Sequence, residues 1–193
     1  MILPSSFYNR PTLKVAQDLL GCFLVRKNPH LRPLPRSSRR GRGGSTLRCK
    51  IVEVEAYNGP RDLASHASQG RTERNSVMFG QPGIIYVYFT YGMHDMLNIV
   101  TEEKEYPAAI LIRAVELESG NGPARLTKAL QIDKCFNGLP IYVKKYGLWV
   151  ESRVKDEKLQ IVKTARIGVD YAGEYKDKKW RFYIKGNEFI SKK

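Results

Sequence analysis

The chain is dominated by short runs of β-branched and aromatic residues that are separated by turn residues rather than by long helical segments. Such side chains pack well on a pleated surface and favour strands. Strands joined directly by turns pair in an antiparallel way. We therefore expect an α+β fold with a curved, mainly antiparallel β-sheet core and flanking helices. The expected strands cover residues 22–26, 47–57, 84–91, 97–101, 108–116, 141–150, 161–167 and 182–184.

The remaining segments complete a simple organisation. Helical spacing predicts helices over residues 12–20 and 123–132, and the second begins with a proline in its first turn. A chain of 193 residues is most simply one domain, covering residues 1–193. Residues 27–47 are rich in Arg, Pro, Gly and Ser and offer almost nothing to bury. We expect a mobile loop there.

The charge of the chain favours a polyanionic partner. Its 33 Lys+Arg and 19 Asp+Glu give a net charge of +14. The first 50 residues alone hold 11 Lys+Arg and a single acid, Asp18. DNA, RNA and an acidic membrane all fit such a charge, and a nucleic acid is the partner that it favours most.

Cysteine and histidine usage excludes several other classes. Cys22, Cys49 and Cys135 are scattered without the paired spacing of a zinc site, which indicates reduced thiols in an intracellular protein. The three histidines also lack metal-ligand spacing. We expect no metal and no cofactor. No apolar run is long enough to cross a bilayer, so we expect no membrane partner.

The strand at residues 47–57 carries two carboxylates. Alternation places Glu53 and Glu55 on the face opposite to Val54. On spacing alone, both are most simply solvent-facing residues of an edge strand. The alternative is a carboxylate held beside aromatic rings and a cation, where it can take a proton from water. The spacing leaves open which of the two would do so.

Several aromatic residues and one arginine accompany these carboxylates. Tyr86 and Tyr88 share one strand face; Tyr86 is most simply a core residue, whereas Tyr88 can stack against a flat ring. His66 lies on a loop of small residues, where a lone histidine is commonly a surface or capping residue. Arg113 interrupts an apolar strand and needs a buried partner. The turn GRTERNS (residues 70–76) either meets phosphates or is simply solvated.

Taken together, these segments resemble a known family. IVEVEAYNGPRDLASHAS, NSVMFGQPGIIYVYFTYGMHDMLNIV and AAILIRAVE are similar to the alkyladenine (3-methyladenine) DNA glycosylases, as are GPARLTKALQI and RIGVDYAGEYKDKKWRFYIKGNEFIS. The resemblance covers nearly the whole chain outside residues 27–47.

The resemblance implies a monofunctional DNA glycosylase of base excision repair. Such an enzyme flips a damaged purine (3-methyladenine, 7-methylguanine, hypoxanthine or ethenoadenine) out of duplex DNA and hydrolyses the N-glycosidic bond with water and no metal, which leaves an abasic site. The implied partner is double-stranded DNA that contains damaged purines. We expect a monomer that acts inside the cell with DNA, in a bacterial cytoplasm or nucleoid or in a eukaryotic nucleus.

The resemblance also assigns the chemistry, residue by residue. Glu55 matches the catalytic glutamate, which resolves the choice between Glu53 and Glu55. Arg113 matches the arginine that helps to hold the glutamate and the attacking water. Ile167 matches a position whose backbone carbonyl binds the same water.

The remaining matches concern the flipped base and the DNA. Three rings match those that enclose the base: Tyr57, His66 and Tyr88. Asn98 matches the asparagine that rejects normal guanine. Tyr91 matches the tyrosine that enters the minor groove and fills the gap in the base stack, and Met78 matches a neighbouring groove-inserting residue.

This sequence departs from the family pattern in three places. Ala67 follows His66 where serine is frequent, His94 and Asp95 lie in the turn after Tyr91, and the loop at residues 27–47 is longer than expected. These departures concern substrate range more than chemistry. The alternative functions are a non-catalytic damaged-DNA binding protein and a general nucleic-acid binding protein.

Overall fold

The structure of the protein is a computed structural model that describes residues 1–28, 45–90, 92–155 and 157–192. In this part of the chain the strands are β1 (Phe23–Asn28), β2 (Ser45–Tyr57), β3 (Ile85–Thr90), β4 (His94–Thr101), β5 (Ala108–Val115), β6 (Leu148–Glu151), β7 (Ile161–Thr164) and β8 (Arg181–Ile184). The α-helices are α1 (Ser5–Tyr8), α2 (Thr12–Leu19) and α3 (Pro123–Leu130). Short 3₁₀ helices are η1 (His66–Gln69), η2 (Ser76–Phe79), η3 (Lys134–Phe136), η4 (Lys144–Tyr146) and η5 (Gly173–Asp177).

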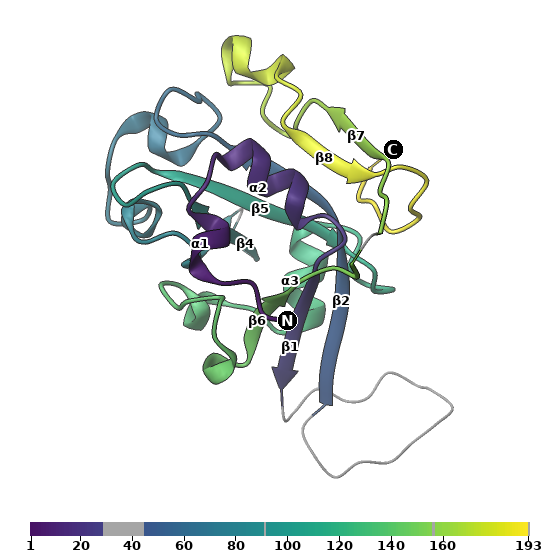
Figure 1. Ribbon diagram of the computed structural model, residues 1–193. Coiled ribbons are helices and arrows are strands. Elements are labelled where there is room, and N and C mark those ends of the chain that lie inside the picture. The colour runs from purple at the N-terminus through teal and green to yellow at the C-terminus, as the bar shows by residue number, and fades with distance from the viewer. Residues whose placement is uncertain (29–44, 91, 156, 193) are drawn as a thin grey trace.

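One antiparallel sheet contains these strands. Its order is β3-β4-β5-β2-β1-β6, and β8 pairs with both β2 and β7. The first half of β2 pairs with β1, and its second half lies between β5 and β8. The register shifts around Glu53, and such a bulge increases the local bend of a strand. Figure 1 shows the resulting curved sheet with α2 lying across β5. The expected α+β fold with a curved antiparallel sheet is confirmed.

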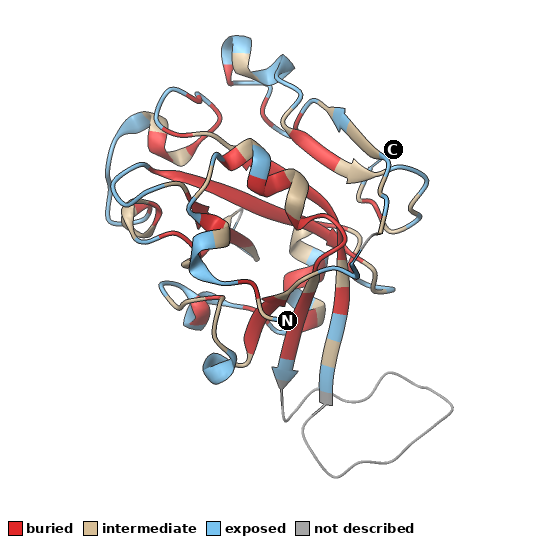
Figure 2. Cartoon of the chain, viewed as in Figure 1, coloured by how far each residue is buried: buried red, intermediate tan, exposed pale blue. Residues whose placement is uncertain are grey.

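The two-residue period of the strands separates the core from a cavity. On β5, Ile110 and Ile112 belong to the main apolar core, whereas Leu111 and Arg113 line a cavity on the other face. The strands β2, β3 and β4 alternate in the same way, so one sheet face packs with α2 and α3 and the other holds the cavity. Figure 2 shows β5 buried along its whole length.

Some expectations drawn from the residue pattern are wrong. Glu53 and Glu55 have no exposed surface and lie in the centre of the sheet, so they are not solvent-facing residues of an edge strand. The run at residues 141–150 is not one strand, because η4 interrupts it before β6. The helix α1 was not expected from the residue pattern.

The boundary regions of the expected loop at residues 27–47 belong to strands. Lys27 lies in β1 and Leu47 in β2, and the two strands pair there. Residues 29–44 lie outside the described part of the chain.

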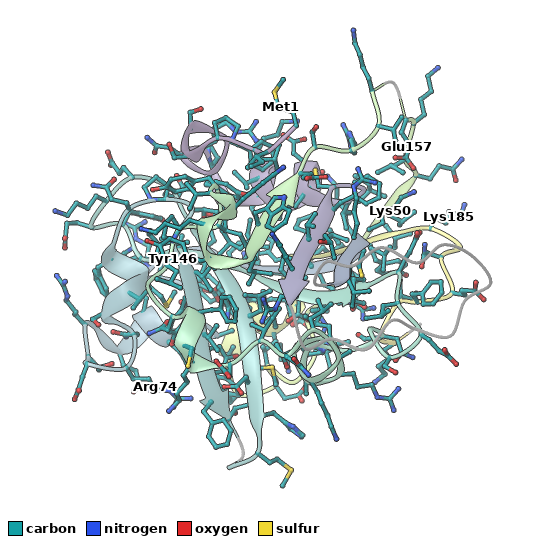
Figure 3. All side chains as sticks on the ribbon, turned by 90° about the horizontal axis from the view of Figure 1, so that it is seen from below. Met1, Lys50, Arg74, Tyr146, Glu157 and Lys185 are labelled. Carbon is teal, nitrogen blue, oxygen red and sulfur yellow. The ribbon has the colours of Figure 1, made fainter. Side chains whose placement is uncertain are left out.

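Figure 3 shows Lys50 and Glu157, an ion pair at 2.9 Å, on the side of the molecule opposite to Arg74. Among the described residues, no helix is long and apolar enough to cross a membrane.

Candidate active site

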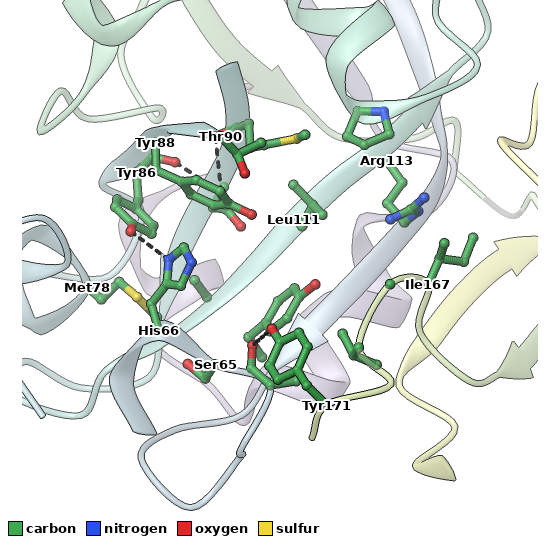
Figure 4. Close-up of a pocket in the computed structure, with 18 residues that line it drawn as sticks. Ser65, His66, Met78, Tyr86, Tyr88, Thr90, Leu111, Arg113, Ile167 and Tyr171 are labelled. Carbon is green, nitrogen blue, oxygen red and sulfur yellow. Dashed lines mark hydrogen bonds between the residues drawn. The ribbon is translucent and has the colours of Figure 1, made fainter. Parts of the chain in front are cut away.

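A cavity of about 310 Å³ opens on the face of the sheet opposite to the main core. Its wall is unusually rich in rings, which come from β2, β3 and the loops that follow β2 and β7: Tyr57, His66, Tyr86, Tyr88 and Tyr171 (Figure 4). Asn98 and Arg113 add polar groups to the wall. A mainly apolar cavity with a few convergent polar groups is the common form of a site for a flat organic ligand.

His66 is held by Tyr86. The Tyr86 hydroxyl and His66 Nδ1 lie 2.9 Å apart, and the rings of His66 and Tyr88 meet edge to face at 4.5 Å. Burial lowers the pKa of His66 below its ordinary value, and the Arg74 charge lowers it further. His66 is therefore neutral at physiological pH, with one nitrogen bonded to Tyr86 and the other on the cavity side (Figure 4).

The loop that carries His66 is fixed by a buried amide. The Asn75 side chain donates hydrogen bonds to the His66 carbonyl (2.9 Å) and the Gly70 carbonyl (2.8 Å). It also accepts a hydrogen bond from the Thr72 amide. Arg74 donates to the Phe89 carbonyl and lies over the Tyr88 ring. The turn at residues 70–76 is therefore not merely a solvated turn, because Asn75 is buried and organises the cavity wall.

Tyr57 lies between the cavity and a buried ion pair that Asp62 and Arg166 form. The guanidinium of Arg166 lies 4.9 Å from the centre of the Tyr57 ring and makes a bidentate pair with Asp62, whose side chain, like that of Arg166, is fully buried. Asp62 also accepts hydrogen bonds from the Asn58 and Ala64 amides. This pair joins the loop after β2 to the loop after β7, and both loops contribute residues to the cavity wall.

Glu55 lies immediately behind the cavity wall. Its carboxylate accepts hydrogen bonds from the Tyr57 hydroxyl (3.0 Å) and the Ile167 amide (2.8 Å), and it pairs with Arg113 Nη1 (3.2 Å). All three partners line the cavity. Burial, and next the Glu55 charge, raise the pKa of Tyr57, which keeps the hydroxyl as a donor. A carboxylate has about four acceptor positions, so one position on Glu55 remains.

Glu53 differs from Glu55 in its hydrogen bonds. Its oxygens accept from Arg113 Nε (3.2 Å), Arg181 Nη1 (3.1 Å) and the Ser191 hydroxyl (2.9 Å), and also from the Ser191 amide. Three of these donors meet Oε1, and the Ser191 amide meets Oε2. The expectation that Arg113 needs a buried partner is confirmed by its contacts to both glutamates. Burial alone would lower the pKa of Arg113, but Glu55 and Glu53 outweigh it and raise that pKa.

The structure brings most of the expected site residues together. Asn98 lies on the cavity wall, and its amide donates to the Tyr86 and Met96 carbonyls. Met78 also lies on the wall but is only 2% exposed, because it packs with Tyr86 in a small apolar cluster. That place differs from the groove-inserting one that the resemblance implies. Tyr91 lies outside the described residues.

Sequence reasoning assigned no site role to six residues of this region: Asp62, Tyr86, Arg166, Tyr171, Arg181 and Ser191. The residue pattern favours Tyr86 as a plain core residue, yet its hydroxyl bonds to His66. The two arginines, Arg166 and Arg181, each carry a charge into a buried place. A charge in an apolar surrounding was the one signal that could have found them. Among the described residues, no group of three or more His, Cys, Asp or Glu side chains is arranged to hold a metal ion.

Comparisons with known proteins agree with this geometry. Residues 6–121 and 118–188 match the family model described as methylpurine-DNA glycosylase. A relative from Methanocella arvoryzae is 44% identical over all of this chain and 96% of its own length. Relatives from Carboxydothermus hydrogenoformans and Clostridium perfringens are 43% and 41% identical over the full length of both chains. All three carry the name "Putative 3-methyladenine DNA glycosylase".

Proposed function

The chain belongs to the methylpurine-DNA glycosylase family, and from this membership we propose how it acts and on which lesions. As a DNA glycosylase of this family, it removes methylated purines from DNA during repair. We propose that it flips 3-methyladenine, 7-methylguanine, hypoxanthine and ethenoadenine out of duplex DNA. We propose further that a water activated by Glu55 hydrolyses the N-glycosidic bond and leaves an abasic site.

The hydrogen bonds of Glu55 carry this proposal. Its carboxylate is buried beside three groups that line a ring-walled cavity, and one acceptor position is left for a water. We place the attacking water at that position, between Arg113 and the backbone of Ile167. The Ile167 carbonyl is the proposed second partner of this water. A carboxylate held in this way can take a proton from the water as the bond breaks.

The charge of Glu55 has a second proposed role. Cleavage of an N-glycosidic bond builds positive character on the sugar, as in other glycosyl transfers. A fixed carboxylate in a cavity shielded from water stabilises such a charge far better than bulk water does. Arg113 is shared between Glu55 and Glu53, so it holds the carboxylate without removing its charge.

The rings of the cavity are the proposed holders of the flipped base. Tyr57, His66 and Tyr88 offer faces and edges to a flat purine. A cationic alkylated purine gains about 0.5–2 kcal/mol from cation–π attraction to such rings. A neutral lesion gains only stacking and edge contacts, so the hydrogen bond from His66 matters more for it. Asn98 is the proposed residue that rejects guanine.

The proposed contact with DNA rests on the positive charge of the chain and on one side chain that fills the gap left by the flipped base. Unstacking a base costs a few kcal/mol, and a side chain that fills the gap offsets part of this cost. We keep Tyr91 as the proposed wedge, on the resemblance alone. The net charge of +14 supplies phosphate affinity that does not depend on sequence, so binding should weaken steeply with salt.

One assay tests the proposed function. Duplex DNA with a single hypoxanthine or 1,N6-ethenoadenine is incubated with the protein and then treated with alkali, which breaks the strand at an abasic site. We expect breaks with the wild type and none with Glu55→Gln, which should still bind the lesion duplex. Glu151→Gln is the matched control, because Glu151 pairs with Arg48 far from the cavity. Cleavage by Glu55→Gln at the wild-type rate would refute the mechanism.

The same assay separates the alternative functions. A damaged-DNA binding protein would bind the lesion duplex and never produce breaks. A general nucleic-acid binding protein would bind undamaged and damaged duplexes equally. The buried Glu55–Arg113 pair beside the cavity speaks against both, because binding alone has no use for a carboxylate that activates water.

A further inference from the structure

Glu53 and the C-terminal segment form a buried cluster behind the catalytic wall. Arg113 uses three different nitrogens for three partners: Nε for Glu53 (3.2 Å), Nη1 for Glu55 (3.2 Å) and Nη2 for the Ser191 hydroxyl (3.3 Å). Arg181 adds a second guanidinium to Glu53 at 3.1 Å. The side chains of both glutamates are fully buried, and those of both arginines are at least nine-tenths buried.

The C-terminal segment, residues 187–192, is docked onto this cluster by several contacts. Ser191 donates both its amide and its hydroxyl to Glu53. The Lys192 carbonyl accepts a hydrogen bond from Arg181. Just before these two residues, Ile190 packs into a small apolar cluster with Val52 and Ala114 of the sheet. The last described residues of the chain therefore complete the surroundings of Glu53.

The charges of this cluster balance. Two carboxylates face two guanidiniums, and Arg113 contacts both carboxylates. A guanidinium held at three nitrogens has a fixed plane, so only Nη1 is directed at Glu55. Removal of the Glu53 charge would leave two cations with one carboxylate, and Arg113 would then be drawn closer to Glu55.

We propose that Glu53 is a positioning residue for the glycosylase reaction, and that Ser191 of the C-terminal segment holds it and Arg113 in their working arrangement. This inference rests on the proposed function, in which Glu55 activates the water. Glu53 itself touches neither the water nor the base in this proposal, because its hydrogen bonds run to Arg113, Arg181 and Ser191, whereas the Tyr57 and Ile167 groups of the cavity wall bond to Glu55. It acts through Arg113.

Ser191→Ala is the milder test, because it removes a hydroxyl without unpairing a buried charge. We expect the single-turnover cleavage rate to fall about three- to tenfold, while the affinity for the lesion duplex stays within about twofold. Ser191→Thr, which keeps the hydroxyl, should restore the rate. Ser152→Ala is the matched control, since the Ser152 hydroxyl accepts a hydrogen bond from the N-terminal amine, which belongs to another part of the molecule. Wild-type rates for Ser191→Ala would overturn the role of the segment.

Glu53→Gln tests the charge. Among the described residues, ionisable groups whose charges are coupled to that of Glu55 include Arg113, Tyr57 and Tyr88. With Glu53 neutral, the surroundings of Glu55 become more positive. We expect the acid limb of the rate–pH profile to move to lower pH, and the rate to fall at least about tenfold. A purely structural Glu53 would change the melting temperature and leave the acid limb in place, and that result would overturn the proposal.

A readout that does not depend on cleavage completes the test. The Arg113 Nη2 protons, which are donated to the Ser191 hydroxyl, should exchange slowly with water in the wild type and rapidly in Ser191→Ala, as followed by NMR of ¹⁵N-labelled arginine. If Glu53→Gln fails to fold, the rate and the exchange of Ser191→Ala decide alone. If the wild type makes no breaks in any lesion duplex, the proposed function fails. If the wild type cleaves and both variants match its rate, exchange and acid limb, only this inference fails.

Discussion

The hydrogen bond between Tyr86 and His66 predicts a lesion-dependent effect of Tyr86→Phe. Burial raises the pKa of Tyr86 to about 12, so its hydroxyl keeps a proton to donate. Neutral imidazole has one donor and one acceptor nitrogen. If Tyr86 donates to Nδ1, Nε2 carries the proton and is a donor toward the cavity. Tyr86 thereby selects the tautomer that can bond to the edge of a neutral lesion.

The size of the effect follows from the burial of this bond. Tyr86 is 1% exposed and His66 is partly buried, so removal of the hydroxyl leaves His66 Nδ1 without its partner. A net hydrogen bond contributes about 1 kcal/mol, and an unsatisfied buried group costs about 1–3 kcal/mol. We expect Tyr86→Phe to lose about 1–2 kcal/mol, which is about 5- to 30-fold, in capture of a hypoxanthine duplex.

The assay compares two lesions under single-turnover conditions. Hypoxanthine is neutral and depends on the edge contact from His66, whereas cationic 7-methylguanine keeps its cation–π attraction to the rings. The loss should be large for hypoxanthine and at most about threefold for 7-methylguanine. Tyr142→Phe is the control, because Tyr142 packs against the main core and not in the cavity. Equal losses on both lesions, or none on either, would refute the tautomer argument.

Three further predictions follow from residues in and next to the cavity wall. Asp62→Asn should lower the free energy of unfolding by about 3–5 kcal/mol in urea melts, because Arg166 then stays buried without its carboxylate. The pKa of His66 is lowered from 6.5 in the folded state, so below pH 6.5 the unfolded chain binds a proton that the native one does not. The free energy of unfolding should therefore fall as the pH drops through this range. The loss is up to about 1.4 kcal/mol for each pH unit between the unfolded and folded pKa values of His66, and the variant His66→Gln should not show it. Tyr171 is 72% exposed at the cavity rim, so Tyr171→Ala should weaken lesion binding by about 1–3 kcal/mol in titrations and change stability by less than about 0.5 kcal/mol.

Much of the fold could be predicted because strand formation here follows local pattern. The aromatic run that forms β3 and the apolar run that forms β5 both alternate between core and cavity with a period of two. The predictions failed where a contact with a distant part of the chain determines the local structure. We expected a strand over residues 161–167, but β7 ends at Thr164, and Arg166 then turns inward to Asp62, which lies 104 residues earlier in the chain. No local pattern contains that pairing.

The site could be predicted in outline for the same reason. Residues 51–98 contain most of the cavity wall, and their rings and carboxylates indicate a pocket for a flat ligand. The groups that orient those rings are mostly long-range contacts. Arg166 beneath Tyr57 and Ser191 on Glu53 come from the last quarter of the chain. Sequence spacing carries no information about which of these groups meet.

Glu53 and Glu55 show most clearly how contacts decide a role that spacing leaves open. The two carboxylates are two residues apart on one strand, fully buried and paired with the same arginine. They differ in what their acceptor positions face. Glu53 bonds to Arg181 and to Ser191 of the C-terminal segment, whereas Glu55 contacts three groups of the cavity wall and keeps one acceptor position for a water in the proposed mechanism. A fourth donor directed at Glu55 would therefore be expected to abolish cleavage and leave the fold intact.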